Sequence, residues 1–384
     1  MILKTKGNIY DIDAPIIGRV TRFPENIGYE ILISENNFSK EWYKFKAVLS
    51  TTKIISSLEI PIIHSIKNLD HLSEGDIVII NTDGIVNTIY RVDSNHNFLL
   101  FTERCNSNCL MCSQPPKDRD DTEYFFNQYS QAIPLIPKDC LEIGITGGEP
   151  TLLGNRFLKL LTQLKKELPE TEIHCLTNGR SFAWENIARK VGEIENNRLM
   201  LAIPLYADVY HIHDYVVQAK DAFNQTVQGI YNLAKYGQRI EIRIVLHKQT
   251  IPRLLKLAKF IYKNMPFVEH IAFMGLEHEG YTSFNIDKLW IDPIDYQEEL
   301  SDAVTYLSDF GMNVSIYNAQ LCTLPQNLWK YSRKSISDWK NIYFDECNKC
   351  DLLHQCGGMF ASGIKKHSDF IKAISYKDAL KQVE

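Results

Sequence analysis

The stretch that decides the fold is residues 98–112, which read FLLFTERCNSNCLMC. The apolar run at residues 98–102 predicts a buried strand, and three cysteines with the spacing C-x3-C-x2-C follow it closely. In folds built from βα units, functional side chains sit on loops at the carboxyl ends of the strands. The stretch therefore predicts a strand that leads into a loop whose three thiols can bind one soft metal centre.

Short apolar runs continue to alternate with amphipathic segments beyond this stretch, which is typical of βα units and a parallel sheet. Six runs predict strands, at residues 98–102, 141–146, 173–177, 199–206, 240–246 and 270–276. Six βα units are too few to close an eight-stranded barrel. We therefore predict an α/β fold with a partial (β/α)6 TIM-like barrel over residues 98–311.

The two flanking regions differ from the barrel in pattern. Residues 1–97 contain short apolar alternations, and Asp83-Gly84 between two of them predicts a hairpin, so we expect a β-rich N-terminal domain. Residues 312–384 contain the remaining clustered cysteines and predict a cysteine-rich C-terminal unit. Its cysteines make it a candidate unit held together by a metal centre.

Composition narrows the functional classes. Apolar residues make up 45% of the 384 residues and charged residues 23%, as in globular proteins. The net charge is -5 without a block of like charge, so we do not expect nucleic acid as a partner. No apolar run approaches the roughly 18 residues of a membrane span, so we expect no membrane association and a cytoplasmic location. Nine cysteines in clusters favour metal or redox chemistry over disulfides.

Polar residues also follow the next predicted strands. Residues 147–150 read Gly-Gly-Glu-Pro, in which glycines allow backbone to approach a ligand and Glu149 can accept from an ammonium group. A zinc-binding loop that borrows a fourth ligand remains an alternative for the three cysteines. No residue pattern identifies a catalytic acid, base or nucleophile.

The cysteines Cys105, Cys109 and Cys112 followed by Gly147, Gly148, Glu149 and Pro150 resemble the radical S-adenosylmethionine (radical SAM) enzymes. In that family the cysteine loop holds a 4Fe-4S cluster with one open iron, and the Gly-Gly-Glu-Pro stretch binds the methionine amino group. The resemblance implies a partial barrel of six strands. It also implies an enzyme that reductively cleaves S-adenosyl-L-methionine to a 5′-deoxyadenosyl radical, which abstracts hydrogen from the substrate.

Further cofactor contacts follow from the same resemblance. Thr177 and Asn178 match polar residues that in this family follow the third strand and often contact the cofactor. Arg243 matches an arginine on the fifth strand that often binds the carboxylate of the cofactor. An arginine suits this role because its fork binds carboxylates through two hydrogen bonds. Met111 stands where the family commonly has an aromatic residue near the adenine, and methionine is adaptable enough for that contact.

A second cysteine set lies near the C-terminus. It consists of four residues, Cys322, Cys347, Cys350 and Cys356. Four thiolates can complete either a 4Fe-4S cluster or a tetrahedral zinc site. The C-x2-C-x5-C spacing resembles the auxiliary-cluster domains of radical SAM peptide maturases. Where that family has a further cysteine this chain has Phe360, which implies a single, fully ligated auxiliary cluster.

Three C-terminal stretches, residues 318–325, 335–341 and 356–363, resemble the C-type radical maturases of His-Xaa-Ser peptide systems. The resemblance, over roughly residues 98–365, implies a ribosomally made precursor peptide as substrate. It further implies a second radical SAM maturase, small companion proteins and a flavodoxin- or ferredoxin-type reductant as partners. The alternatives are a radical SAM enzyme that acts on a small molecule or nucleoside, and a zinc-stapled scaffold without catalytic activity.

Overall fold

The computed structural model describes residues 3–377 apart from 27, 36–39, 55–59 and 335–339. Residues 335–339, part of one stretch behind the His-Xaa-Ser resemblance, thus lie outside the described residues. The chain divides into two compact units that alternate along the sequence. The first comprises residues 1–101, 121–145 and 155–173, and the second comprises residues 102–120, 146–154 and 174–384. The three regions expected from the sequence follow other boundaries and stay a prediction.

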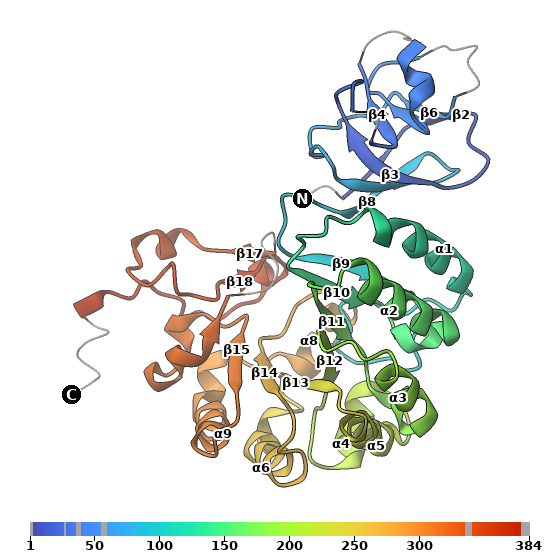
Figure 1. The fold of residues 1–384 in the computed structure, drawn as a ribbon. Coiled ribbons are helices and arrows are strands. Elements are labelled where there is room, and N and C mark those ends of the chain that lie inside the picture. The colour runs from blue at the N-terminus through green and yellow to red at the C-terminus, as the bar shows by residue number, and fades with distance from the viewer. Residues whose placement is uncertain (1–2, 27, 36–39, 55–59, 335–339, 378–384) are drawn as a thin grey trace. The chain divides into compact units, whose positions relative to one another are not determined.

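The N-terminal part of the first unit is an eight-stranded sheet with the order β1-β8-β7-β3-β4-β5-β6-β2 (Figure 1). Its strands are β1 (Lys4–Lys6), β2 (Asn8–Tyr10), β3 (Ile16–Thr21), β4 (Ile31–Ile33), β5 (Ala47–Leu49), β6 (Ile62–His64), β7 (Ile77–Ile80) and β8 (Ile85–Tyr90). The expected hairpin at Asp83-Gly84 is confirmed, because β7 and β8 pair antiparallel and Gly84 has a φ of 80°. β1 and β2 are the two edge strands of this sheet, yet only Gly7 separates them in the sequence. The two edges therefore lie close together, and the sheet curls back on itself.

The first unit also contains the start of the βα pattern. Its elements are β9 (Asn97–Leu100), α1 (Thr122–Ala132), most of β10 (Glu142–Thr146), α2 (Asn155–Glu167) and the first residues of β11 (Glu172–Leu176). In α2 the buried residues are Phe157, Leu160, Leu161 and Leu164. Their spacing of three and four residues places them on one helix face, as packing against a sheet requires.

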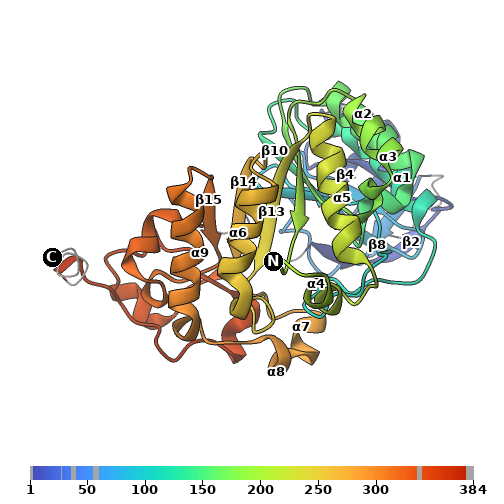
Figure 2. The same ribbon diagram turned by 90° about the horizontal axis from the view of Figure 1, so that it is seen from below.

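In the second unit the strands are hydrogen-bonded in the order β11 to β16. Its further strands are β12 (Leu199–Pro204), β13 (Arg239–Val245), β14 (His270–Met274), β15 (Val314–Tyr317) and β16 (Ser332–Arg333), and its helices are α3 (Glu185–Gly192), α4 (Tyr210–Val217), α5 (Ala222–Lys235), α6 (Leu254–Asn264), α7 (Tyr281–Phe284), α8 (Ile286–Leu289) and α9 (Gln297–Asp309). The pairs from β12 to β16 are parallel. Helices α5, α6 and α9 lie along one face of these strands (Figure 2).

The expected fold class is confirmed, with one difference in strand number. The α/β pattern builds a partial, nearly closed barrel, and each expected apolar run forms a strand. Two further strands, β15 and β16, join the same sheet beyond the six expected ones. Residues 314–317 fall within the region 312–384, expected from the sequence to be a separate unit, yet they extend the barrel sheet, because Ile271 pairs with Val314.

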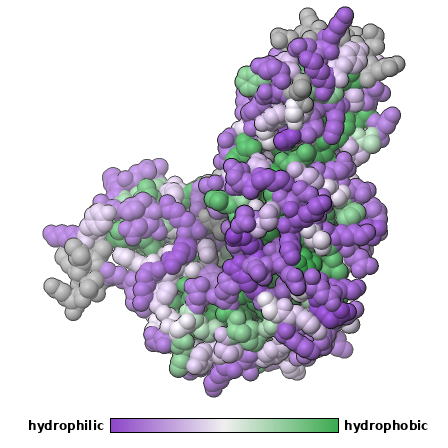
Figure 3. Space-filling model, viewed as in Figure 1, coloured by the Kyte–Doolittle hydropathy of each residue, from purple (hydrophilic) through white to green (hydrophobic). Residues whose placement is uncertain are grey.

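The C-terminal segment consists mostly of short 3-10 turns with the two-stranded pair β17 (Asn341–Ile342) and β18 (Met359–Phe360). Hydrophilic residues predominate on the molecular face drawn in Figure 3. Among the described residues, no helix combines the length and the apolar character that crossing a membrane requires.

Candidate functional site

The three-cysteine loop leaves the sheet directly after β9 and lies in the second unit. Burial, followed by the charge of Glu149, raises the pKa of the Cys105 thiol to about 11. Burial and then the neighbouring Cys112 and Cys105 raise the pKa of Cys109. As thiolates the three groups repel one another, so bound positive charge is needed to stabilise all three together. This donor set fits a metal cluster.

Backbone hydrogen bonds hold the loop in place. The amides of Asn108 and Leu110 donate to carbonyls at the end of α4, at 3.0 and 2.9 Å. From the other side, the Tyr281 amide donates to the Cys112 carbonyl at 2.8 Å, and the Asn285 side chain donates to the Leu110 carbonyl at 3.0 Å. Helices α7 and α8 therefore position the cysteines, a role that the sequence pattern did not reveal.

The glycines of the Gly-Gly-Glu-Pro stretch allow close contact with the start of the cysteine loop. A Cβ on Gly148 would lie 2.0 Å from the Arg104 carbonyl oxygen, and one on Gly147 would lie 2.5 Å from that of Thr102. The Gly148 and Glu149 amides donate to these same two carbonyls, at 2.8 and 2.7 Å. The glycines thus bring two stretches of backbone together, and their expected contact with a ligand stays a prediction.

Glu149 is fully buried and connects two strand-end loops. One carboxylate oxygen accepts from the Thr151 and Thr177 hydroxyls, both at 2.7 Å, and the other accepts from the Asn178 amide at 2.7 Å. Burial raises the pKa of Glu149, and these hydrogen bonds only partly oppose the increase. Protein groups thus already donate to the carboxylate. Glu149 also caps the short 3-10 turn that begins at Pro150.

Asn178 and Arg180 reach from the third strand end to the cysteine loop. The Asn178 side-chain amide lies 2.6 Å from the Asn106 oxygen and 3.9 Å from the Cys105 sulfur. Arg180 donates to the Asn106 carbonyl and, at 3.0 Å, to the Ser107 hydroxyl. Sequence reasoning selected Asn178 but missed Arg180, although a charged residue two positions beyond a polar strand end is a usable signal.

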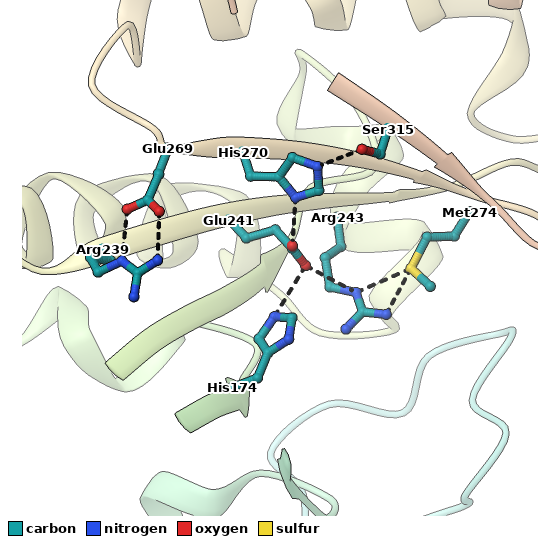
Figure 4. A network of polar contacts seen from close by, with 8 residues as sticks. All are labelled: His174, Arg239, Glu241, Arg243, Glu269, His270, Met274 and Ser315. Carbon is teal, nitrogen blue, oxygen red and sulfur yellow. Dashed lines mark hydrogen bonds and ion pairs between the residues drawn. The ribbon is translucent and has the colours of Figure 1, made fainter. Parts of the chain in front are cut away.

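Arg243 belongs to a buried polar network on β13 and its neighbours (Figure 4). Its guanidinium lies 3.7 Å from Glu241 and contacts the Met274 sulfur at 2.8 Å. Glu241 also contacts His270 at 2.7 Å and His174 at 3.3 Å. Burial alone would raise the pKa of Glu241, but the two histidines and Arg243 outweigh it and hold the pKa well below 4.5. Glu241 therefore stays ionised at neutral pH.

One Arg243 nitrogen, Nη1, is buried without a hydrogen-bond partner among the described residues. It faces a cavity lined by His174, Glu241, Arg243, Ala272, Met274, Tyr317 and Asn318. An unpartnered guanidinium N–H in a cavity is suited to bind an anionic group of a ligand. Met111 belongs to an apolar cluster that includes Tyr206 and Val216, and its expected contact with the adenine stays a prediction.

Residues 99–261 match the family model described as the Radical SAM superfamily. This part of the chain is a radical SAM domain. The match includes the three-cysteine loop, the Gly-Gly-Glu-Pro stretch and Arg243.

Curated relatives share the radical SAM domain only in part. A GTP 3′,8-cyclase from Petrotoga mobilis is 25% identical over 208 residues, which cover 52% of this chain and 61% of that protein. An uncharacterized protein of Methanocaldococcus jannaschii is 24% identical over 170 residues, 43% of this chain and 58% of that protein. The chain thus spans about three fifths of the length of these two relatives.

One solved structure that matches part of this chain is titled native anSMEcpe with bound AdoMet and Cp18Cys peptide. It is 18% identical, covers 74% of this chain and 94% of its own, and superposes with a TM-score of 0.48.

Outside the radical SAM domain, four cysteines line one largely apolar cavity: Cys322, Cys347, Cys350 and Cys356. Backbone amides point at two of the sulfurs. Leu321 and Gly358 donate to Cys356, both at 3.5 Å, and Ile374 donates to Cys350 at 3.4 Å. Amide donors of this kind stabilise thiolate ligands and tune iron-sulfur clusters. In the part of the chain that the structure describes, no three His, Cys, Asp or Glu side chains are grouped tightly enough for a single metal ion.

Proposed function

We propose that this chain is a radical SAM enzyme. The observation that carries the proposal is the three-cysteine loop of the radical SAM domain, whose three thiol groups are held beside the Gly-Gly-Glu-Pro stretch and would repel one another as thiolates. In this proposal Cys105, Cys109 and Cys112 hold a 4Fe-4S cluster that leaves one iron open. When bound, the reduced cluster supplies an electron that splits the sulfonium of S-adenosyl-L-methionine into methionine and a 5′-deoxyadenosyl radical.

The protein's own groups orient the cofactor and exclude water. Arg243 offers its free Nη1–H to the methionine carboxylate, and the ionised Glu241 holds that guanidinium in place. Gly147, Gly148 and Asn178 present backbone and amide groups beside the cysteine loop. Glu149, which accepts from Thr151, Thr177 and Asn178, also holds the two loops together, and the Gly-Gly-Glu-Pro stretch keeps its proposed contact with the methionine amino group. Met111 keeps its proposed place near the adenine.

The C-terminal cysteines are proposed to hold one auxiliary 4Fe-4S cluster. The amide donors aimed at Cys350 and Cys356 support this assignment, because sulfur ligands of clusters commonly accept such hydrogen bonds. Full ligation by four cysteines would leave no iron open for substrate. Zinc stays the alternative occupant for the same four ligands.

For the substrate we propose a ribosomally made precursor peptide with His-Xaa-Ser repeats. The proposal rests on the resemblance of the C-terminal stretches, and it includes a second radical SAM maturase, small companion proteins and a flavodoxin- or ferredoxin-type reductant as partners. The similarity to a GTP 3′,8-cyclase supports a second candidate, a nucleotide substrate.

The test uses the anaerobically reconstituted full chain with S-adenosyl-L-methionine and dithionite. One arm adds a synthetic His-Xaa-Ser repeat peptide, the second adds GTP, and mass spectrometry follows each substrate. We expect a mass change of the peptide that depends on S-adenosyl-L-methionine. An unchanged peptide together with a converted nucleotide would reject the peptide substrate and establish the second candidate.

A further inference from the structure

A second cavity lies at the carboxyl ends of β13, β14 and β15, next to the cavity of Arg243. Its walls come from the strand ends, from the segment after α8 and from the C-terminal segment, and they include His278, Trp290, Tyr296, Asn318 and Lys366. Asn318 lines both cavities. An occupant would therefore sit next to the proposed cofactor site.

The one permanently charged side chain in this wall is a lysine. Lys366 places its ammonium 4.2 Å from the centre of the Trp290 ring, and the imidazoles of His278 and His367 also line the wall. Burial, followed by the nearby His367 and Lys366, lowers the pKa of His278, so its neutral ring serves as a hydrogen-bonding group. The lining contains no aspartate or glutamate. Several acids adjoin the lining along the chain. Among them, Glu277 forms an ion pair with Lys340 at 2.9 Å, Asp292 accepts from the Ile294 amide at 3.1 Å, and Asp369 is exposed. The wall therefore attracts an anionic group.

Two polar atoms of the wall are buried and have no hydrogen-bond partner among the described residues, His278 Nδ1 and Asn318 Oδ1. Buried polar atoms usually have a partner, so unpartnered atoms that line a cavity point to a ligand. Asn318 is only 9% exposed, and its backbone has a φ of 57°, a conformation that few residue types tolerate. Its amide oxygen can accept from an N–H group of the occupant.

We propose that this cavity binds the substrate segment of a peptide through a carboxylate, held by Lys366 and His278, and a backbone N–H, held by Asn318. Apolar walls from Leu246, Leu276 and Tyr296 would take a neighbouring apolar side chain. The proposal rests on the proposed function for the peptide class, and it adds that the recognised segment is acidic.

The test measures binding to the reconstituted full chain by fluorescence anisotropy. The probe is a fluorescein-labelled Ala-Leu-Asp-Ala-Gly amide, and its matched partner has Asn in place of Asp. We expect wild type to prefer the Asp peptide by about fivefold, as for one exposed ion pair. Lys366→Gln should abolish the preference, and Lys365→Gln, a change at an exposed residue outside the lining, should keep it.

A second variant separates the amide contact from the charge. Asn318→Gly removes the hydrogen-bond acceptor, and glycine adopts the positive φ at this position without strain. The variant should bind both peptides about threefold more weakly and keep the preference for the Asp peptide. Free succinate should compete only at much higher concentration than the Asp peptide. The proposal is overturned if wild type has no Asp preference, if Lys366→Gln keeps it, or if succinate competes as well as the peptide.

Cofactor cleavage by wild type is measured separately. A chain that forms 5′-deoxyadenosine but shows no Asp preference would reject this cavity as the acidic-peptide site and leave the proposed function standing. If the protein prefers the Asp peptide but forms no 5′-deoxyadenosine, the proposed function is rejected and the cavity remains the proposed binding site for an acidic peptide.

Discussion

At the scale of single residues, buried carboxylates organise the site. Glu149 holds the loops after β10 and β11, and Glu241 holds Arg243 and two histidines. Each lies in a region where an unpaired charge would cost several kcal/mol, so each depends on its donors. Removing a donor should therefore affect stability measurably.

Thr177→Val tests the Glu149 hydrogen bonds. The change keeps the side-chain shape and removes the hydroxyl that donates at 2.7 Å to a fully buried carboxylate. We expect a loss of about 2 kcal/mol in the free energy of unfolding, measured with urea. Thr177→Ser, which keeps a hydroxyl, is the control and should lose clearly less. Equal losses in the two variants would mean that the hydroxyl is not what stabilises the loop.

Glu241→Gln tests the network on β13 through pH. Because the folded pKa of Glu241 is held below 4.5, its stabilising contribution is fully present at neutral pH and is lost as the pH falls from about 4.5 towards the folded pKa. We expect the variant to be about 3 kcal/mol less stable at pH 7, with a gap that shrinks below pH 4.5.

Glu269→Gln is the matched control for that experiment. Glu269 also pairs with a cation, Arg239 at 2.7 Å, but the pair is substantially exposed and should contribute less than about 1 kcal/mol. A Glu241→Gln gap that is independent of pH, or no larger than that of the control, would contradict the role given to Glu241.

Part of the site was predictable from these residues, and part was not. Cysteine spacing and the Gly-Gly-Glu-Pro stretch are local patterns, so the sequence alone identified them. The contact between Glu241 and His270 joins residues on two strands whose register only the folded sheet defines. Even so, Glu241 and Arg243 two residues apart in an apolar strand lie on one face, which was a readable signal.

At the scale of elements, the site depends on backbone packing between loops. The segment of residues 147–149 lies against residues 102–104, which lead into the cysteines. The glycines are required because no Cβ fits between these two backbones. The sequence indicated a close approach at this point, but it could not show which partner approaches.

Gly148→Ala tests this packing. The new Cβ would lie 2.0 Å from the Arg104 carbonyl oxygen, and since both groups are backbone-fixed, one loop must move. We expect a loss of about 3 kcal/mol in stability and less iron per chain after reconstitution. Gly154→Ala is the control for iron content, because its Cβ would meet open space and only its backbone conformation, φ 59° and ψ -128°, is unfavourable, by about 2 kcal/mol. Normal iron content in Gly148→Ala would reject the argument.

Cys350→Ala tests the C-terminal cysteine cavity. The loss of one of four ligands should remove the auxiliary metal but leave the iron of the radical SAM domain, so iron per chain should fall to about half. Cys140→Ala, which changes a cysteine outside both sets, should leave the iron unchanged. If Cys350→Ala instead releases zinc at constant iron, the zinc alternative holds. If the content of both metals is unchanged, the C-terminal cysteines do not bind a metal centre.

At the scale of the whole molecule, the chain assembles its proposed cofactor site from distant segments of one compact unit. Residues 102–120, 146–154 and 174–384 together supply the cysteines, the Gly-Gly-Glu-Pro stretch and Arg243. The strand order was predictable up to β14 because each strand precedes a helix. The additions of β15 and β16 were not, since a short apolar run carries no information about its pairing partner.

The central claim is that the three-cysteine loop supports reductive cleavage of S-adenosyl-L-methionine. The most direct measurement is 5′-deoxyadenosine formed by the anaerobically reconstituted, dithionite-reduced chain, compared with Cys109→Ala. Wild type should form 5′-deoxyadenosine and the variant none, because two thiolates cannot hold the cluster with an open iron. Equal formation by both proteins, or none by wild type loaded with iron and sulfide, would contradict the account.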